Sequence, residues 1–401
     1  MKIKINKYCL FIAVIIFFNL QGFYLLDANV FHTDDLSVVL ELLFIFFELK
    51  GREKSTGKKY FSLLMLIPIV LVLSSSFAAY ISYGQPLWYG IRAQRTWLMA
   101  MLMYFPLVNL LKSKRISSTD LTRTLNIMVW FYMILIVLQY VVGTRLMFFH
   151  VGYSFRYNSI RLYVLTYLIV LNYFIHLKKI LTATHFRFTD TLVLIFTLYI
   201  HFFVVKSRMG LIAIIISTLF AIVSTRFSIK KLIATSIAVL SMIAFVMTSY
   251  GHGVMNSIFG EEAQDAGTQI REAGREFYIQ QVTSSKLSMM IGKGYANLDW
   301  QPTLKATHYL DGIYYNDNGI IGLAYYYGLI FIVWMIFIHI KTMKLSWRYG
   351  KEYFWFLLCG LVGSYTLFPY CYVNDISFAL ALAIIDNNNE KIELLNLHKR
   401  R

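Results

Sequence analysis

The sequence has few charged residues for its length. They make up 15% of the 401 residues, whereas an ordinary soluble domain has about 25%. Hydrophobic residues make up 58% and recur in blocks of roughly membrane-spanning length from end to end. This composition excludes a soluble enzyme and predicts an all-α, polytopic integral membrane protein.

Cysteine is also scarce, with only Cys9, Cys359 and Cys371 in the whole chain. On one helix, Cys359 and Cys371 would lie about 18 Å apart at 1.5 Å per residue, which is too far for a disulfide. The cysteines therefore indicate neither a disulfide framework nor a metal centre.

The motifs of nucleotide-dependent and metal-dependent enzymes are missing. The chain has no Walker loop, no dinucleotide glycine fingerprint and no Gly-x-Ser-x-Gly elbow in a supporting context. It also lacks an Asp-x-Asp site for a nucleotide sugar. We therefore expect no cofactor and no metal, and look for a site at the membrane surface.

Positive charge is in excess, with a net charge of +17, but it lies between the apolar blocks. That placement argues against nucleic acid as a partner. At the N-terminus, Lys2, Lys4 and Lys7 precede an apolar run, 8–26, that ends without a small-residue cleavage site. We interpret this run as an uncleaved first span.

Twelve apolar segments are expected to cross the membrane. They are 8–25, 36–49, 60–79, 91–111, 127–142, 162–177, 191–205, 211–225, 232–247, 319–340, 353–368 and 375–385. With both termini in the cytoplasm, 26 of the Lys and Arg residues lie inside and 12 outside, as the positive-inside rule requires.

This topology divides the chain into four parts. Spans one to nine occupy 1–247, a large extracytoplasmic loop 248–318, spans ten to twelve 319–385 and a cytoplasmic tail 386–401. The loop holds most of the extracytoplasmic acidic residues, and its segment 262–284 reads as a helix.

Arginine dominates the positive charge of the outer face, with 8 Arg against 4 Lys, whereas the inner face has 8 Arg and 18 Lys. Because the guanidinium group binds phosphate in bidentate fashion, the outer face is predicted to bind an anion. The alternative is that these are ordinary interfacial side chains that reach toward water. Arg271 and Arg275 lie on one face of the helix expected at 262–284. If Glu272 pairs with Arg275, this helix is only a solvated surface with a salt bridge and no binding site.

Four features in the second half of the chain occur in a familiar order. They are Ser207-Arg208-Met209-Gly210, Gly274-Arg275-Glu276, Ile291-Gly292-Lys293-Gly294-Tyr295, and His308 ahead of Gly319-Ile320-Ile321-Gly322. In these features the chain resembles the superfamily of O-antigen polymerases and O-antigen ligases, which are bacterial envelope glycosyltransferases. The ligases have Asn, Ser or Gln after the histidine, whereas Tyr309 stands here, and this favours a polymerase.

The resemblance implies a metal-independent, inverting glycosyltransferase in the cytoplasmic (inner) membrane of a bacterium. Its donor is an undecaprenyl-diphosphate-linked oligosaccharide on the outer face, and its product is O-antigen, capsular polysaccharide or exopolysaccharide. Membrane lipid, a chain-length regulator and a flippase are the other implied partners.

The resemblance also implies roles for individual residues. Arg208 and Arg275 would stabilise the diphosphate, and His308 would act as general base on the acceptor hydroxyl. Asp311 would orient His308 or replace it. A loop histidine bonded to backbone and a turn-capping aspartate are the plain alternatives. Gly319 and Gly322 we interpret as structural.

Further cations and one aromatic residue of the outer face are candidates for substrate binding. They are Arg156, Arg161, Lys206, Arg271, Lys293 and Tyr295. For the aromatic residues, an interfacial belt is the default interpretation.

Two alternative functions remain. An O-antigen ligase would differ only in its acceptor. A flippase for lipid-linked oligosaccharide would be a transporter and not an enzyme. Transporters are typically built from matched halves, whereas this chain gathers its polar residues in one loop after span nine, and Glu41 is the one acid clearly inside a span. Both observations favour the enzyme.

Overall fold

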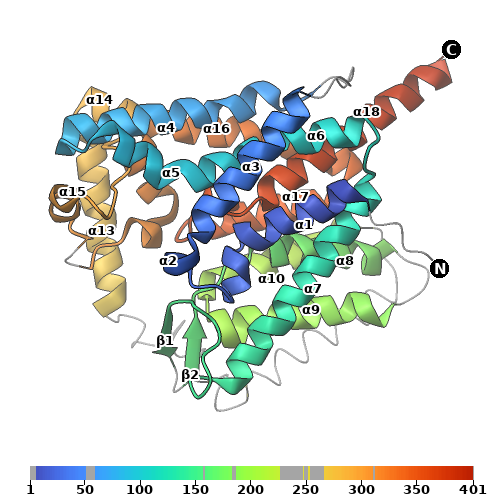
Figure 1. The fold of residues 1–401 in the computed structure, drawn as a ribbon, viewed down its shortest axis with the longest axis horizontal. Helices are drawn as coiled ribbons and strands as arrows, with labels where there is room; N and C mark the ends of the chain where they lie inside the picture. The colour runs from blue at the N-terminus through green and yellow to red at the C-terminus, as the bar shows by residue number, and fades with distance from the viewer. Residues whose placement is uncertain are drawn as a thin grey trace.

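Long helices run side by side between two ends of the molecule in the computed structural model (Figure 1). The structure describes residues 6–50, 59–156, 159–182, 187–225, 247, 252, 266–309 and 312–400. The predicted ninth span, 232–247, lies outside these residues except for its last position, and so does the first part of the predicted loop apart from position 252.

The N-terminal part of the chain is helical. Its elements are α1 (Lys7–Asn19), η1 (Gln21–Tyr24), α2 (Ala28–Phe31), α3 (Thr33–Lys50), α4 (Ser62–Tyr83), α5 (Leu87–Leu102), α6 (Tyr104–Lys112) and α7 (Ser118–Val142). Helix α7 begins at a capping box of Ser117 and Asp120 and ends at Gly143, as its sequence favours.

The remaining elements include a hairpin and a group of short helices. They are β1 (Tyr153–Arg156), β2 (Ser159–Leu162), α8 (Tyr167–Thr182), α9 (Phe188–Tyr199), the π-helical turn η2 (Ile200–Val205), α10 (Arg208–Val223), α13 (Ala266–Thr283), α14 (Lys286–Ile291), α15 (Gln301–Ala306), η5 (Tyr315–Asn318), α16 (Gly319–Tyr349), α17 (Lys351–Gly363), η6 (Tyr370–Tyr372) and α18 (Ser377–Arg400).

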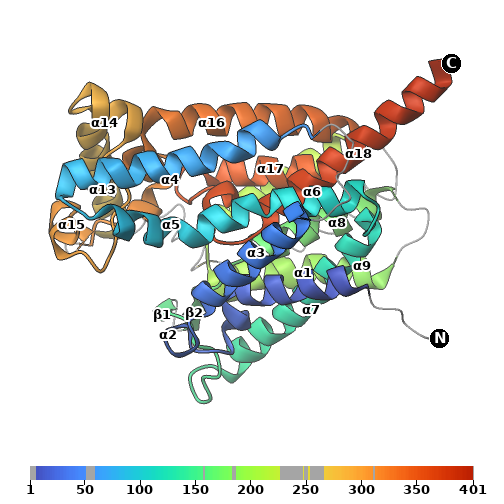
Figure 2. The ribbon, with the colours of Figure 1, turned by 45° about the horizontal axis from the view of Figure 1, so that its top comes forward.

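The two ends of the bundle differ in what they carry. Helices α13, α14 and α15 and the β1–β2 hairpin lie at one end, which we call the loop end, and the last turns of α18 project from the other, the far end (Figure 2). At the far end, Asn6 Nδ2 donates to the Arg115 carbonyl at 2.9 Å. At the loop end, the His150 amide donates to the Tyr24 carbonyl at 2.7 Å.

Four helical segments are long and apolar enough to cross a membrane. They are Ser62–Tyr83, Ser118–Val142, Phe188–Val205 and Tyr315–Arg348. Helices α1 and α10 are apolar but shorter. Within the described residues, helices make up nearly all of the regular structure, which supports a helical membrane protein.

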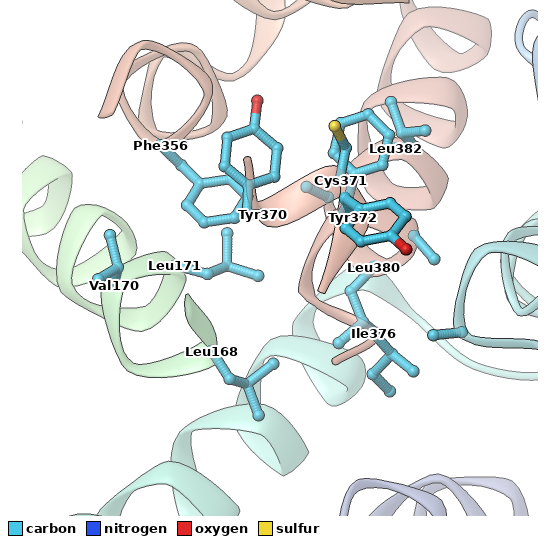
Figure 3. Close-up of a cluster of buried hydrophobic side chains, with 14 of the residues drawn as sticks. Leu168, Val170, Leu171, Phe356, Tyr370, Cys371, Tyr372, Ile376, Leu380 and Leu382 are labelled. Atoms are coloured by element: carbon cyan, nitrogen blue, oxygen red, sulfur yellow. The ribbon is translucent and has the colours of Figure 1, made fainter. Parts of the chain in front are cut away.

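The core is rich in aromatic side chains. Figure 3 shows one part of it, where Leu168 and Leu171 of α8, Phe356 of α17 and Leu380 of α18 surround the turn η6. Tyr370 of η6 is fully buried and packs on Phe356, with ring centres 4.6 Å apart. This short turn therefore lies inside the helix bundle rather than at its surface.

Three observations depart from the sequence predictions. The all-α class is supported, but the chain also has one small antiparallel hairpin, β1–β2, that was not predicted and in which Tyr153 pairs with Leu162. The segment 91–111 is not one helix, because α5 ends at Leu102 and α6 begins at Tyr104. Pro106 has no amide to bond to the Leu102 carbonyl, which explains a break at this point. Finally, the helix of the last predicted span, α18, begins at Ser377 and continues through the predicted tail to Arg400.

Candidate functional site

The described part of the large loop packs against α16 at the loop end. Tyr278 of α13 donates from its hydroxyl to the Ile313 carbonyl at 3.1 Å, and its ring lies 4.8 Å from that of Tyr325 in α16. Burial raises the pKa of Tyr278, so the hydroxyl stays protonated and remains a donor. Helix α13 covers Ala266–Thr283, so its described part agrees with the helix expected at 262–284.

The motif Ile291-Gly292-Lys293-Gly294-Tyr295 threads between α4 and α16. Gly294 has φ +94°, and a Cβ placed on it would lie 2.1 Å from the Ala79 amide nitrogen of α4. Only glycine fits there without a shift of the backbone. The Lys293 amide donates to the Tyr325 carbonyl at 2.7 Å. The motif thus fixes the path of the loop between the two helices. The resemblance to the family had not implied this structural role.

Tyr295 belongs to a group of packed tyrosines. Its ring centre lies 4.4 Å from that of Tyr326 and 6.2 Å from that of Tyr315, while its amide donates to Ser75 Oγ at 2.9 Å. Burial raises the pKa of Tyr295. Its ring is half-buried and forms part of the floor beneath the loop.

The start of α16 is held against the end of α17. Gly319 has φ +52°, and a Cβ on it would meet the Ser364 carbonyl oxygen at 2.2 Å. The same oxygen accepts from the Ile320 amide at 2.9 Å. This close approach agrees with the structural interpretation of Gly319. It also brings η5, which precedes Gly319, next to Tyr365, which follows Ser364.

Arg275 reaches across this junction to Tyr365. Its guanidinium carbon lies 4.7 Å from the Tyr365 ring centre, and Nη1 donates to the Tyr365 hydroxyl at 2.8 Å. Its Nε is buried and has no hydrogen-bond partner among the described residues. No ion pair joins Glu272 to Arg275 in the described part of the chain, and the partner of Arg275 is Tyr365 instead.

Arg271 lies one turn earlier on α13 and faces η5. Its Nε is 3.9 Å from Asp317 Oδ2, and both side chains are about half exposed, at 50% and 44%. A pocket with a volume of about 190 Å³ lies here. Its lining residues are Ile270, Arg271, Gly312, Tyr314, Asp317 and Asn318.

A second group of cations surrounds the start of α10. Arg161 of β2 donates from Nε to the Val205 carbonyl at 2.9 Å and stacks over Tyr163 at 4.8 Å. Lys206 follows with φ +52° and a buried side chain. Arg208 is the first residue of α10, and the Ser207 side chain caps this helix by accepting from the Gly210 amide. A helix N-terminus attracts negative charge, and Arg208 adds to that attraction.

The two groups of cations lie at the same end of the bundle because α10 and α17 are antiparallel. Ala213 of α10 packs against Gly363 of α17, and further along Phe220 packs on Phe354 with ring centres 5.7 Å apart. The N-terminus of α10 therefore lies beside the C-terminus of α17. Arg208 begins the one, and Tyr365, the partner of Arg275, follows the other.

His308 lies on the connection between α15 and η5. It has φ +52°, its side chain is exposed, and its ring meets the edge of Phe277 of α13 at 4.9 Å between ring centres. Phe277 is two residues from Arg275, which is about 200° around α13, so the helix side that contacts His308 differs from the side that carries Arg275. Asp311 lies outside the described residues. Arg156 ends β1, at the loop end with the other candidates.

Sequence reasoning missed several residues of this site. Tyr365, Asp317, Tyr314 and Asn318 surround the two loop arginines, yet only Tyr314 had been considered, as one of several outer-loop aromatic residues. Asp317 and Asn318 precede Gly319 directly, and that proximity was the one available signal. Tyr365 follows an apolar segment, where an aromatic residue is typical of any interfacial belt.

Comparison with known proteins assigns the chain to no family. No family model matches it, and no curated protein matches its sequence.

Proposed function

We propose that the chain is a polysaccharide polymerase of a bacterial cytoplasmic membrane. It transfers a growing glycan from undecaprenyl diphosphate to the terminal sugar of a new lipid-linked repeat unit. The product is O-antigen, capsular polysaccharide or exopolysaccharide. The chain crosses the membrane twelve times with both termini inside, and the loop end faces outward.

One observation carries this proposal. Two arginines from distant parts of the sequence, Arg208 and Arg275, belong to elements that meet at the loop end through α10 and α17. Arg275 is held by the uncharged Tyr365, so its positive charge is not neutralised by that partner. Guanidinium groups and a helix N-terminus together suit a diphosphate.

The reaction follows from these groups. The acceptor hydroxyl attacks the anomeric carbon of the growing chain, and the bond from that carbon to the diphosphate oxygen breaks. Undecaprenyl diphosphate leaves with the electron pair, and preorganised arginines stabilise its charge as it develops. His308 takes the hydroxyl proton as general base. Attack opposite to the leaving group inverts the anomeric configuration.

The other functions make different use of the same residues. A ligase would move the glycan to another envelope acceptor, and Tyr309 after His308 argues against it. A flippase would need no base. The loop residues Arg271, Arg275 and Asp317, together with Tyr365 after α17, form a close set that favours a reaction site over a transport path.

A deletion strain separates these functions. Gel analysis of the envelope polysaccharide should show single repeat units if the polymerase is lost. Unattached polymer would indicate a ligase, and undecaprenyl-linked units retained inside would indicate a flippase. Purified protein given lipid-linked repeat units, without added divalent metal, should produce a ladder of longer glycans. A purified protein that binds these lipids but never lengthens the glycan would overturn the proposal.

A further inference from the structure

The pocket between α13 and η5 combines the groups that recognise a sugar. Arg271 supplies only hydrogen-bond donors and Asp317 only acceptors. Their closest atoms are 3.9 Å apart, which is longer than a direct hydrogen bond. A hydroxyl group both donates and accepts, so it can bridge the two side chains. Both are about half exposed and accessible to a ligand.

Asn318 and Tyr314 complete the pocket. Asn318 is 1% exposed, and its Nδ2 donates to the Tyr314 carbonyl at 3.1 Å, which sets the orientation of the amide. Its Oδ1 has no hydrogen-bond partner among the described residues. An unsatisfied buried acceptor is unfavourable and is expected to find a donor. Tyr314 as a whole residue is 41% exposed and lines the pocket, so its ring is available to a ligand.

Charge distinguishes this pocket from the Arg275 position. Arg275 has the neutral Tyr365 as its partner, and its charge is available for an anion. Arg271 faces the Asp317 carboxylate, which would repel a phosphate group. The pocket therefore suits an uncharged ligand with hydroxyl groups, whereas the neighbouring arginine suits the diphosphate.

The positions of the two arginines along α13 also support separate sites for the sugar and for the diphosphate. Arg271 and Arg275 are four residues apart on one helix, a rise of about 6 Å. A ligand in the pocket would therefore lie about one helical turn from a diphosphate at Arg275. With about 190 Å³, the pocket is smaller than the ~300–1,000 Å³ typical of drug-sized ligands, and its size suits a single sugar residue.

We infer that the pocket of Arg271, Tyr314, Asp317 and Asn318 binds the terminal sugar of the acceptor. This inference rests on the proposed function and extends it, because it assigns the acceptor to a place separate from the donor diphosphate. The ligand class is a neutral pyranose whose free hydroxyls contact Arg271 and Asp317 and whose apolar face lies on Tyr314.

Direct binding tests the assignment. The full chain in lipid nanodiscs is titrated with the single repeat-unit oligosaccharide, released from its lipid by mild acid, and followed by saturation-transfer NMR. Asp317→Asn keeps the side-chain shape but removes a charged acceptor, and Tyr314→Ala removes the ring. Hydrogen bonds to charged groups contribute ~1.5–3 kcal/mol, so the half-saturating concentration should rise at least about tenfold in Asp317→Asn. It should also rise in Tyr314→Ala, which loses the apolar face.

Asp299→Asn is the matched control. Asp299 is an exposed carboxylate in the same loop and does not line the pocket, so this change should leave binding as in the wild type. Each variant must keep the size-exclusion profile and thermal midpoint of the wild type. If Asp317→Asn does not, Arg271→Gln tests the exposed side of the same pair.

The outcomes separate this inference from the proposed function. If the wild type lengthens lipid-linked units but the pocket variants bind the oligosaccharide normally, the pocket assignment is wrong and the polymerase stands. A wild type that binds no oligosaccharide also overturns the pocket. If the wild type binds through the pocket but makes no ladder, the polymerase proposal fails and the pocket remains a glycan site.

Discussion

Arg275 stacks on Tyr365, with 4.7 Å from the guanidinium carbon to the ring centre, and also donates to its hydroxyl at 2.8 Å. The two residues are 90 positions apart and come from the loop and from the end of α17. The contact fixes the guanidinium plane without neutralising its charge. Lysine lacks that plane and could not reproduce the arrangement.

The first prediction concerns this guanidinium. Arg275→Lys keeps the positive charge but loses the planar fork, so elongation by purified protein should fall by about 10²–10³. Arg208→Lys should have an effect of similar size. Tyr365→Phe is the control for position, because it keeps the ring under the guanidinium and removes only one hydrogen bond.

The double variant tests whether the two arginines act on one ligand. Residues that share a partner usually show a coupling energy of about 0.5–3 kcal/mol, so the effects of Arg208→Lys and Arg275→Lys should not add. Normal polymer length and amount in both single variants, at normal expression, would show that neither arginine binds the diphosphate.

The second prediction concerns His308. A general base typically contributes about 10²–10⁴ in rate, so His308→Ala should abolish most elongation while insertion and lipid binding persist. The measurement is turnover of lipid-linked repeat unit by purified protein at matched concentration. If His308 only packs against Phe277, the variant should instead have a lower protein level. Turnover within about threefold of the wild type would exclude the base role.

Much of the helical fold could be predicted because apolar runs are a strong local signal. The predicted spans 60–79 and 127–142, which lie in α4 and α7, have such runs, and α7 also has its capping box. The β1–β2 hairpin was missed because its strands have four residues each, with weak alternation. The first residues of α18 beyond 385 are held by tertiary contacts that the local sequence does not show, since Asp386 is polar yet fully buried by its partners.

The candidate site was predictable only in part. Arg208, Arg271, Arg275 and His308 could be selected because arginine and histidine have distinctive chemistry and stood on the outer side of the predicted topology. Their neighbours could not, since Tyr365 reaches Arg275 only through the packing of two distant segments. Pairing across such distances has no local signature in a single sequence.

The third prediction concerns topology. Gln280 is exposed on α13 at the loop end, and Thr119 is exposed at the start of α7 at the far end. In a background with Cys9→Ala, where Cys359 and Cys371 are buried, Gln280→Cys should react with an impermeant maleimide on intact cells. Thr119→Cys should react only after the cytoplasmic face is opened. The reverse labelling pattern would contradict the outward orientation of the loop end.

The last prediction concerns a buried ion pair at the far end. Lys112 Nζ lies 2.7 Å from Asp386 Oδ1, and the two side chains are 1% and 0% exposed. The other oxygen, Oδ2, accepts from the Tyr104 hydroxyl at 2.5 Å and the Tyr60 amide at 2.7 Å, which ties α6 and the start of α4 to α18.

Lys112→Met leaves the carboxylate buried without its cation, a change that typically costs about 3–5 kcal/mol. The thermal midpoint of the purified protein should fall clearly. Arg95→Met is the control, because Arg95 Nη2 lies at the same 2.7 Å from Asp35 Oδ1 but the two side chains are 28% and 49% exposed, and exposed pairs contribute only about 0–1 kcal/mol. Equal midpoints for the two variants would show that the Lys112 pair does not stabilise the junction.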